Sequence, residues 1–152
     1  MFRGNEPAKV DEKGRLKIPA AFKQLVDAQH VTQFYITSTD GESAEVWPLP
    51  EWEKQESLLA ESSTMDEAVD NYLDLTSYYG QQVEMDAQGR VVLPHILRET
   101  AQLNAQVAVL GKLRYIVVKN LQKLKESLPA KALTAEKKQS LAKTLTRPGR
   151  TE

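Results

Sequence analysis

The sequence predicts an α+β protein that is rich in β-strands and contains two homologous units of about fifty residues. The first observation is a segment, Val10 to Pro19, that returns 75 positions later as Met85 to Pro94. The second is that Asp, Gly, Arg and Pro recur at the same offsets while the apolar positions stay apolar. The third is that the likeness continues into a helix and two further strands. An internal repeat of this kind decides the predicted fold.

Each copy of this segment predicts a strand, a tight turn, a second strand and a helix. The Asp opens the turn through its short side chain, and the Gly three residues later takes a positive φ that other residues resist. Polar and apolar residues then alternate, as in a strand. The Pro suits the first position of a helix, where its missing N–H has no partner anyway. The turn residues are Asp11 and Gly14 in the first copy, and Asp86 and Gly89 in the second.

The remaining elements of the two units follow in order. A helix is expected from Pro19 to about Ala28, because its apolar residues are spaced for one buried side. Apolar strands are expected at 33–37 and 44–48, and in the second unit at 107–110 and 115–118. We therefore place the first unit at 5–48, a helical linker at 49–80, the second unit at 81–119 and a basic helical tail at 120–152.

The linker is too apolar to be a flexible tether, and two helices are expected in it. Pro48 ends the preceding strand, and a helix starts near Glu51. Thr64, followed three residues later by Glu67, is a capping-box pattern that starts the second helix. Gly80 ends it.

The tail is also predicted to be helical. Leucines at helical spacing follow Asn120, and Pro129 is expected to end that helix. Thr134 is expected to cap a last helix. Residues 146–150 are expected to fray.

Composition limits the class of protein. A chain of 152 residues is one domain, or two small ones that share a core. No apolar run reaches the ~18 residues of a membrane span, and no basic-then-apolar leader opens the chain, so we expect neither membrane insertion nor export. The chain has no cysteine, which excludes disulfides, thiolate metal sites and cysteine catalysis, and suits a reducing cytoplasm.

No motif of catalysis or cofactor binding appears in the sequence. The seven glycines are scattered and form neither a phosphate-binding loop nor a Gly-x-Ser-x-Gly elbow. His30 and His95 have no partner at ligand spacing, which favours surface or helix-end histidines over a metal site. We therefore expect no metal, no cofactor and no enzymatic activity.

The charge distribution is polarised although the net charge is only −1. Residues 1–23 contain six Lys or Arg against three acids, residues 40–86 contain thirteen acids and one base, and residues 119–152 contain nine bases and three acids. Such segments either bind partners of opposite charge or are simply solvated faces, and charge alone leaves both interpretations open.

The strand after the first turn predicts a basic ridge. Arg15 and Lys17 share one face of this strand, because side chains alternate. The apolar residues between and after them must pack inward, so the two cations project outward beside Lys13 of the turn. The second unit keeps only Arg90 of the three cations.

Asp11 and Arg15 lie four residues apart across the turn, and two interpretations of this pair are compatible. In the structural one, the Asp accepts turn N–H bonds and pairs with the Arg, which fixes the hairpin. In the functional interpretation, the arginine that Asp11 holds in place donates hydrogen bonds from its guanidinium group to a guanine edge or a phosphate. A two-stranded ribbon of this kind fits the major groove of double-stranded DNA. One chain has few such cations, so an oligomer would be needed to sum several contacts over repeated targets.

Four stretches in this order closely resemble the bacterial MraZ family: 1–4, 11–19, 49–53 and 85–99. The resemblance implies two AbrB/SpoVT-like swapped-hairpin repeats that form a small β-barrel core with flanking helices. It implies a ring-shaped homo-oligomer and a sequence-specific DNA-binding transcriptional regulator in the cytoplasm, associated with the nucleoid. Its target would be tandem repeats at its own promoter, in the division and cell-wall gene cluster.

The family's Asp-x-x-x-Arg signature is tied to DNA contact. It carries over to Asp11 with Arg15 and to Asp86 with Arg90. Arg3 matches the N-terminal segment of the family. The predicted DNA contacts are therefore Arg15, Arg90, Lys13, Lys17 and Arg3, with Asp11, Gly14, Asp86 and Gly89 in structural roles.

The chain departs from the family pattern in two places. Residues 114–120 contain no Trp, although the family's second unit ends with an acidic-aromatic strand and a Trp-bearing helix. Asp70 and Asp74 stand where the linker helix of relatives carries basic residues. The alternative function is a non-enzymatic protein-interaction or antitoxin-like module, which would hold a basic partner through acidic helix residues such as Glu53, Asp70 and Asp74.

Overall fold

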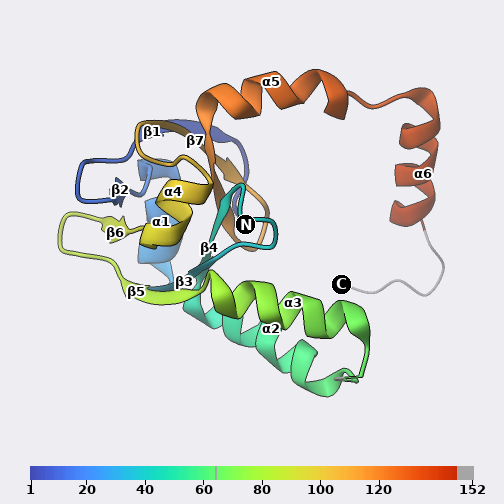
Figure 1. The fold of residues 1–152 in the computed structure, drawn as a ribbon, viewed down its shortest axis with the longest axis horizontal. Coiled ribbons are helices and arrows are strands. Elements are labelled where there is room, and N and C mark those ends of the chain that lie inside the picture. Colours follow the sequence, from blue (N-terminus) through green and yellow to red (C-terminus); the bar gives the residue numbers. More distant parts are fainter. Residues whose placement is uncertain (64, 147–152) are drawn as a thin grey trace.

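The protein is an α+β structure, as predicted from the sequence, in which six antiparallel strands form one sheet and two short strands form another (Figure 1). The computed structural model describes residues 1–63 and 65–146. The large sheet has the order β1-β7-β8-β4-β3-β5, and the small one pairs β2 with β6. The strands are β1 Asn5–Lys9, β2 Arg15–Lys17, β3 Gln33–Thr37, β4 Ala44–Pro48, β5 Gln81–Glu84, β6 Arg90–Val92, β7 Gln106–Gly111 and β8 Ile116–Asn120.

The two repeats are interleaved, because each hairpin leaves its own unit and pairs with the other one. Strand β1 of the first unit pairs with β7, with Lys9 opposite Gln106. In the matching arrangement β5 pairs with β3, with Glu84 opposite Gln33. This is the swapped-hairpin arrangement that the family resemblance implied, and it is formed within a single chain.

The expected small barrel is not closed. Strands β1 and β5 are the two ends of the large sheet, and no pairing joins them in the described residues. Beyond these edges the chain turns away into β2 and β6, which pair with each other. Pro7 lies on the edge strand β1, where its lack of an N–H removes no ladder bond from the interior of the sheet.

The core lies between the small sheet, the large sheet and two helices, α1 (Ala20–Ala28) and α4 (His95–Thr100) (Figure 1). Each helix follows a Pro that sits at its N-cap. Phe22 of α1 and Leu97 of α4 are buried at equivalent places, in the same hydrophobic core as the inner side chains Leu16 and Val91 of the small sheet. The small sheet is therefore fixed to the body by its apolar face.

Two helices join the units and project from the body as an antiparallel pair: α2 (Leu49–Glu61) and α3 (Glu67–Tyr78) (Figure 1). Trp52 of α2 is buried and stacks on Tyr35, with 4.7 Å between ring centroids. The Asp66 side chain caps α3 by accepting from the amides of Ala68 and Val69. Thr64, the predicted capping residue, lies outside the described residues.

The tail contains α5 (Leu121–Lys131) and α6 (Ala135–Leu145). The prediction that Pro129 ends the first of these is wrong. Pro129 lies in the last turn, where its missing N–H removes only one bond, and the helix continues to Lys131. Thr134 caps α6 as predicted, since its hydroxyl accepts from the amide of Lys137 at 3.2 Å. The fraying expected at 146–150 falls mostly on residues 147–150, outside the described part.

Among the described residues, no helix is both long enough and apolar enough to cross a membrane.

Candidate nucleic-acid interface

The first hairpin turn is organised around one carboxylate. Oδ1 of Asp11 accepts the backbone N–H of Arg15 at 2.8 Å and that of Lys13 at 3.0 Å. Oδ2 accepts Nε of the Arg15 guanidinium at 2.7 Å. Gly14 closes the turn at φ +77°, a conformation that favours glycine. The Asp therefore holds both the backbone of the turn and the arginine side chain.

The second turn repeats this geometry. Oδ1 of Asp86 accepts the backbone N–H groups of Arg90 and Gln88, both at 2.9 Å, and Oδ2 accepts Nε of Arg90 at 2.8 Å. Gly89 has the same φ of +77° as its counterpart. The two sites agree because the same four residue types recur at the same offsets.

These contacts keep the two carboxyl groups ionised. Hydrogen bonds from the backbone N–H of Arg15 lower the pKa of Asp11, and the Arg15 side chain lowers it further. Asp86 has its pKa lowered in the same way by Arg90. Each ion pair uses only Nε, and the terminal guanidinium nitrogens donate no hydrogen bond to a described residue. Each arginine is thus oriented while its fork stays available to a ligand.

Pairing of β2 with β6 joins the two hairpins into one surface. Arg15 lies opposite Val92, and Lys17 lies opposite Arg90. The residues between them, Leu16 and Val91, point inward and are buried. We call the outward side of this two-stranded sheet, together with the first turn, the basic ribbon; its cations are Lys13, Arg15, Lys17 and Arg90.

The basic ribbon places like charges directly across from each other. Lys17 faces Arg90 in the register of the two strands, an arrangement that destabilises a sheet. Val92 on the same side is 47% exposed. An anionic partner would relieve the repulsion and cover the apolar side chain. This surface is therefore better suited to binding than to stabilising the isolated chain.

Two further cations, Lys23 and Arg98, lie against the turns, and the sequence analysis did not select them. A Cβ placed on Gly14 would lie 2.6 Å from Cδ of Arg98, and one on Gly89 would lie 2.7 Å from Cε of Lys23. Each side chain thus crosses the turn of the opposite unit. The signal was present, because a basic residue recurs at equivalent positions of α1 and α4.

Lys23 and Arg98 differ in their partners. Nζ of Lys23 forms an ion pair with Oδ2 of Asp27 at 2.6 Å. Nε of Arg98 is buried and has no hydrogen-bond partner among the described residues. Both positions nevertheless add positive charge beside the basic ribbon.

Arg3 lies away from the basic ribbon. It follows Phe2, which pairs with Leu113 beside the β7–β8 connection. The whole of β1, five residues or roughly 17 Å of strand, separates Arg3 from the first turn. The structure brings Lys13, Arg15, Lys17 and Arg90 together and leaves Arg3 at the other end of the sheet.

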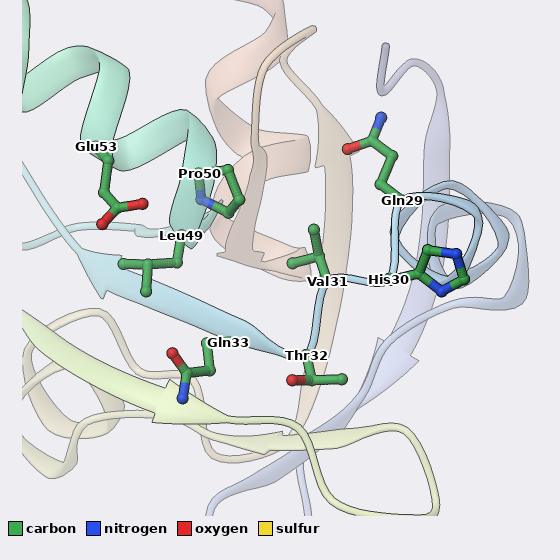
Figure 2. A pocket seen from close by; sticks show the side chains of 8 residues that line it. All are labelled: Gln29, His30, Val31, Thr32, Gln33, Leu49, Pro50 and Glu53. Carbon is green, nitrogen blue, oxygen red and sulfur yellow. The ribbon is translucent and has the colours of Figure 1, made fainter.

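The two histidines do not form a site with each other. Nε2 of His95 lies 2.8 Å from Oε1 of Glu99, four residues further along α4, so the expectation that His95 has no carboxylate partner is wrong. His30 lines an open hollow of about 240 Å³, in which Figure 2 shows it at the opposite end from Glu53. No group of three or more His, Cys, Asp or Glu suited to a metal occurs in the described residues.

Fold and surface together define a class of protein: an α+β chain in which two swapped β-hairpins pair and present two Asp-braced arginines. A family model described as "MraZ protein, putative antitoxin-like" matches residues 1–74 and 80–140. The chain belongs to the MraZ family.

Several curated relatives carry the name "Transcriptional regulator MraZ". The one from Acidobacterium capsulatum is 54% identical over 142 residues, which is 93% of this chain and 97% of the relative. The one from Koribacter versatilis is 44% identical over 143 residues, with the same coverage of each chain. A third, from Thiobacillus denitrificans, is 32% identical over 112 residues, 74% of this chain and 76% of the relative. These relatives are named as regulators and not as enzymes.

Proposed function

We propose that this protein is a sequence-specific transcriptional regulator that binds double-stranded DNA through the basic ribbon. The observation that carries the proposal is the pairing of β2 with β6, which sets two braced arginines on one two-stranded ribbon. A two-stranded ribbon is narrow enough to enter the major groove, and an oriented guanidinium matches the O6 and N7 acceptors of guanine. The names of the relatives agree with this function.

The residues of the surface divide into two roles. Arg15 and Arg90 would read base edges, because each is held by its Asp with the fork free. Lys13 and Lys17 would contact phosphates, which positions the ribbon without specifying sequence. Arg3 would touch the DNA backbone only outside the stretch that the ribbon occupies, since it lies at the far end of β1.

A single ribbon has few cations, so one chain alone would bind weakly and with strong salt dependence. We propose that copies associate into a ring-shaped homo-oligomer whose ribbons engage tandem repeats, which adds affinity through effective concentration. By family resemblance the target would be the protein's own promoter in the division and cell-wall gene cluster, on nucleoid DNA in the cytoplasm. In this scheme the units at 5–48 and 81–119 form the reading surface, and the linker at 49–80 and the tail at 120–152 serve other contacts.

The test is a gel shift of the full chain with its own upstream region across a salt series. Arg15→Ala is expected to weaken specific binding by about 1–3 kcal/mol, because one bidentate base contact is lost. Lys17→Ala is expected to weaken specific and random duplexes alike and to reduce the salt slope by about 1. Lys54→Ala, a change of the single base on the acidic linker, is the matched control and should bind as the wild type does.

Circular dichroism must first show that each variant keeps the wild-type fold. A folded Arg15→Ala protein that shifts the upstream region with wild-type affinity would contradict the assignment of the basic ribbon. So would equal affinity of the wild type for the upstream region and for random duplex at every salt concentration.

A further inference from the structure

Helix α6 is exposed along its whole length in the part of the chain that the structure describes. Every residue from 131 to 146 is exposed, and none of α6 is buried. Figure 1 shows α5 carrying α6 away from the sheets. An isolated helix of eleven residues is marginal in water, because most helical stability comes from packing. The exposure of α6 therefore indicates that this helix packs against a partner outside the single folded chain.

The side chains of α6 indicate the chemistry of its partner. Leu141 and Leu145 are four residues apart, so they lie on one side of the helix, and they are 47% and 61% exposed. At 100° per residue, Lys137 and Lys138 flank this leucine stripe. The complementary surface must combine apolar side chains with negative charge. DNA phosphates would use the lysines but not the leucines.

Helix α3 presents such a surface. Residues 49–79 contain eight acids and one base. On α3, Glu67, Asp70 and Asp74 follow each other at helical spacing, and none of them forms an ion pair with a described residue. Next to them Tyr78 is 68% exposed and Leu75 is 36% exposed. Apolar side chains thus border unpaired carboxylates on one side of the helix.

We propose that α6 of one copy docks on α3 of a second copy of this chain. In the complex, Leu141 and Leu145 would cover Leu75 and Tyr78, and the lysines would face the carboxylates. The occupant is a second copy and not the same chain, because α6 stands exposed in the folded chain and does not cover its own α3. The inference specifies the self-association proposed above and does not depend on DNA contact.

The absence of cysteine from the chain allows a direct test with one cysteine per protein. Full-length Leu145→Cys and Asn71→Cys proteins are mixed without DNA and treated with a short bis-maleimide. A cross-linked product containing one of each is expected. Gln139→Cys, on the opposite side of α6 from the leucines, is the matched control and should give about tenfold less of this product.

Charge reversal then tests the pairing. Lys137→Glu with Lys138→Glu on the tail reporter, or Asp70→Lys with Asp74→Lys on the α3 reporter, should each reduce the cross-linked product about tenfold against an unreversed partner, because attraction becomes repulsion. Mixing the tail reporter that carries both Lys→Glu changes with the α3 reporter that carries both Asp→Lys changes should restore the yield of cross-linked product. Unchanged yields in the single reversals, or no restoration in the double one, would overturn the proposal.

Two other results would assign α6 elsewhere. If a chain carrying both cysteines cross-links only within itself, α6 docks on its own α3 and the second-copy assignment is wrong. If reversal of the tail lysines weakens the gel shift but leaves the cross-linking unchanged, α6 contacts DNA. The Arg15→Ala protein should cross-link as the wild type does, so failure of this interface and failure of the DNA surface are distinguishable.

Discussion

At each of the two hairpin turns, a single carboxylate accepts hydrogen bonds from two backbone amides and from the guanidinium of an arginine. An arginine held by Nε loses less side-chain entropy when it meets a base, because its direction is already set. The same contact withdraws part of its positive charge from non-specific attraction to phosphates. In the proposed DNA complex, the Asp would therefore act on sequence specificity through the arginine beside it.

Asp11→Asn tests this at the scale of one residue. The amide oxygen still accepts backbone N–H groups, so the turn is expected to form, but the charged pairing with Arg15 is lost. We expect the affinity for the upstream region to fall relative to random duplex, so that the ratio of the two dissociation constants shrinks. Glu12→Gln removes one neighbouring exposed charge without touching Arg15 and is the control. A ratio that changes equally in both variants would show that only net charge matters.

Glu45 differs from the turn carboxylates, because it is buried next to Trp47 and accepts its indole N–H at 2.9 Å. Burial raises the pKa of Glu45, so the folded protein binds this proton more tightly than the unfolded chain does. Its contribution to stability is therefore largest at low pH and is lost as pH rises through the raised pKa. For Asp11 and Asp86 the pKa is lowered, and their contribution is lost as pH falls through that lowered pKa.

Glu45→Gln should accordingly raise the melting temperature more at high pH than at low pH, because the wild type must bury a charge once the pH exceeds the raised pKa of Glu45. The difference should vanish below the ordinary carboxyl pKa of 4.5, where the wild-type side chain is neutral in both states. Thermal denaturation of both proteins across a pH series measures this difference in melting temperature. The exposed Glu42→Gln is the control, and an equal shift there would show that overall charge causes the effect.

At the scale of elements, each turn of one unit is covered by a helix of the other. Two features require a glycine at position 14: its φ is positive, and Arg98 of α4 occupies the space that a Cβ would take. Gly4 also has a positive φ, of +97°, but a Cβ there would meet nothing within 4 Å. Comparing substitutions at Gly14 and Gly4 therefore separates the cost of backbone strain from the cost of the contact with α4.

Gly14→Ala is expected to lower the melting temperature by several degrees more than Gly4→Ala. Both changes cost about 1–2 kcal/mol of backbone strain, and only the first must also displace Arg98. Arg98→Ala in the Gly14→Ala background should recover part of the loss, which a double-mutant cycle measures. Equal losses at the two glycines, without recovery, would show that α4 does not press on the turn.

At the scale of the whole molecule, the swapped hairpins make the two units dependent on each other. Strand β1 of the first unit pairs with β7 of the second unit, and strand β5 of the second unit pairs with β3 of the first. The basic ribbon itself needs one strand from each unit. We therefore expect that neither unit can bury its apolar strands as a monomer, although the repeats look separate in the sequence.

Residues 1–80 and 81–152, expressed separately, should therefore lack a cooperative thermal transition as monomers, and mixing them should restore it together with the wild-type circular dichroism. Calorimetry with sedimentation measures both the transition and the mass. The intact chain is the control. A monomeric fragment that melts cooperatively by itself would show that the interleaved pairing is not needed for folding.

Much of the local structure was predictable from the sequence, because short-range chemistry determines it. The Asp and Gly spacing predicted both turns, the alternation predicted β2 and β6, and the Pro residues marked the starts of α1 and α4. The Asp–Arg contact spans only four residues, so it too could be inferred. Pro129 shows the limit of local rules, because its effect depends on how much of the helix remains after it.

By itself, then, the sequence determined the repeat, the elements and the identity of the braced arginines, since each depends on residues within one turn or one helix. Only the tertiary structure decided that Lys17 faces Arg90, that Lys23 and Arg98 cross the opposite turns, that Arg3 lies apart and that the sheet stays open. These features depend on pairing between strands about 75 residues apart. Such pairing is selected by burial of the whole apolar surface, which no short stretch of sequence contains.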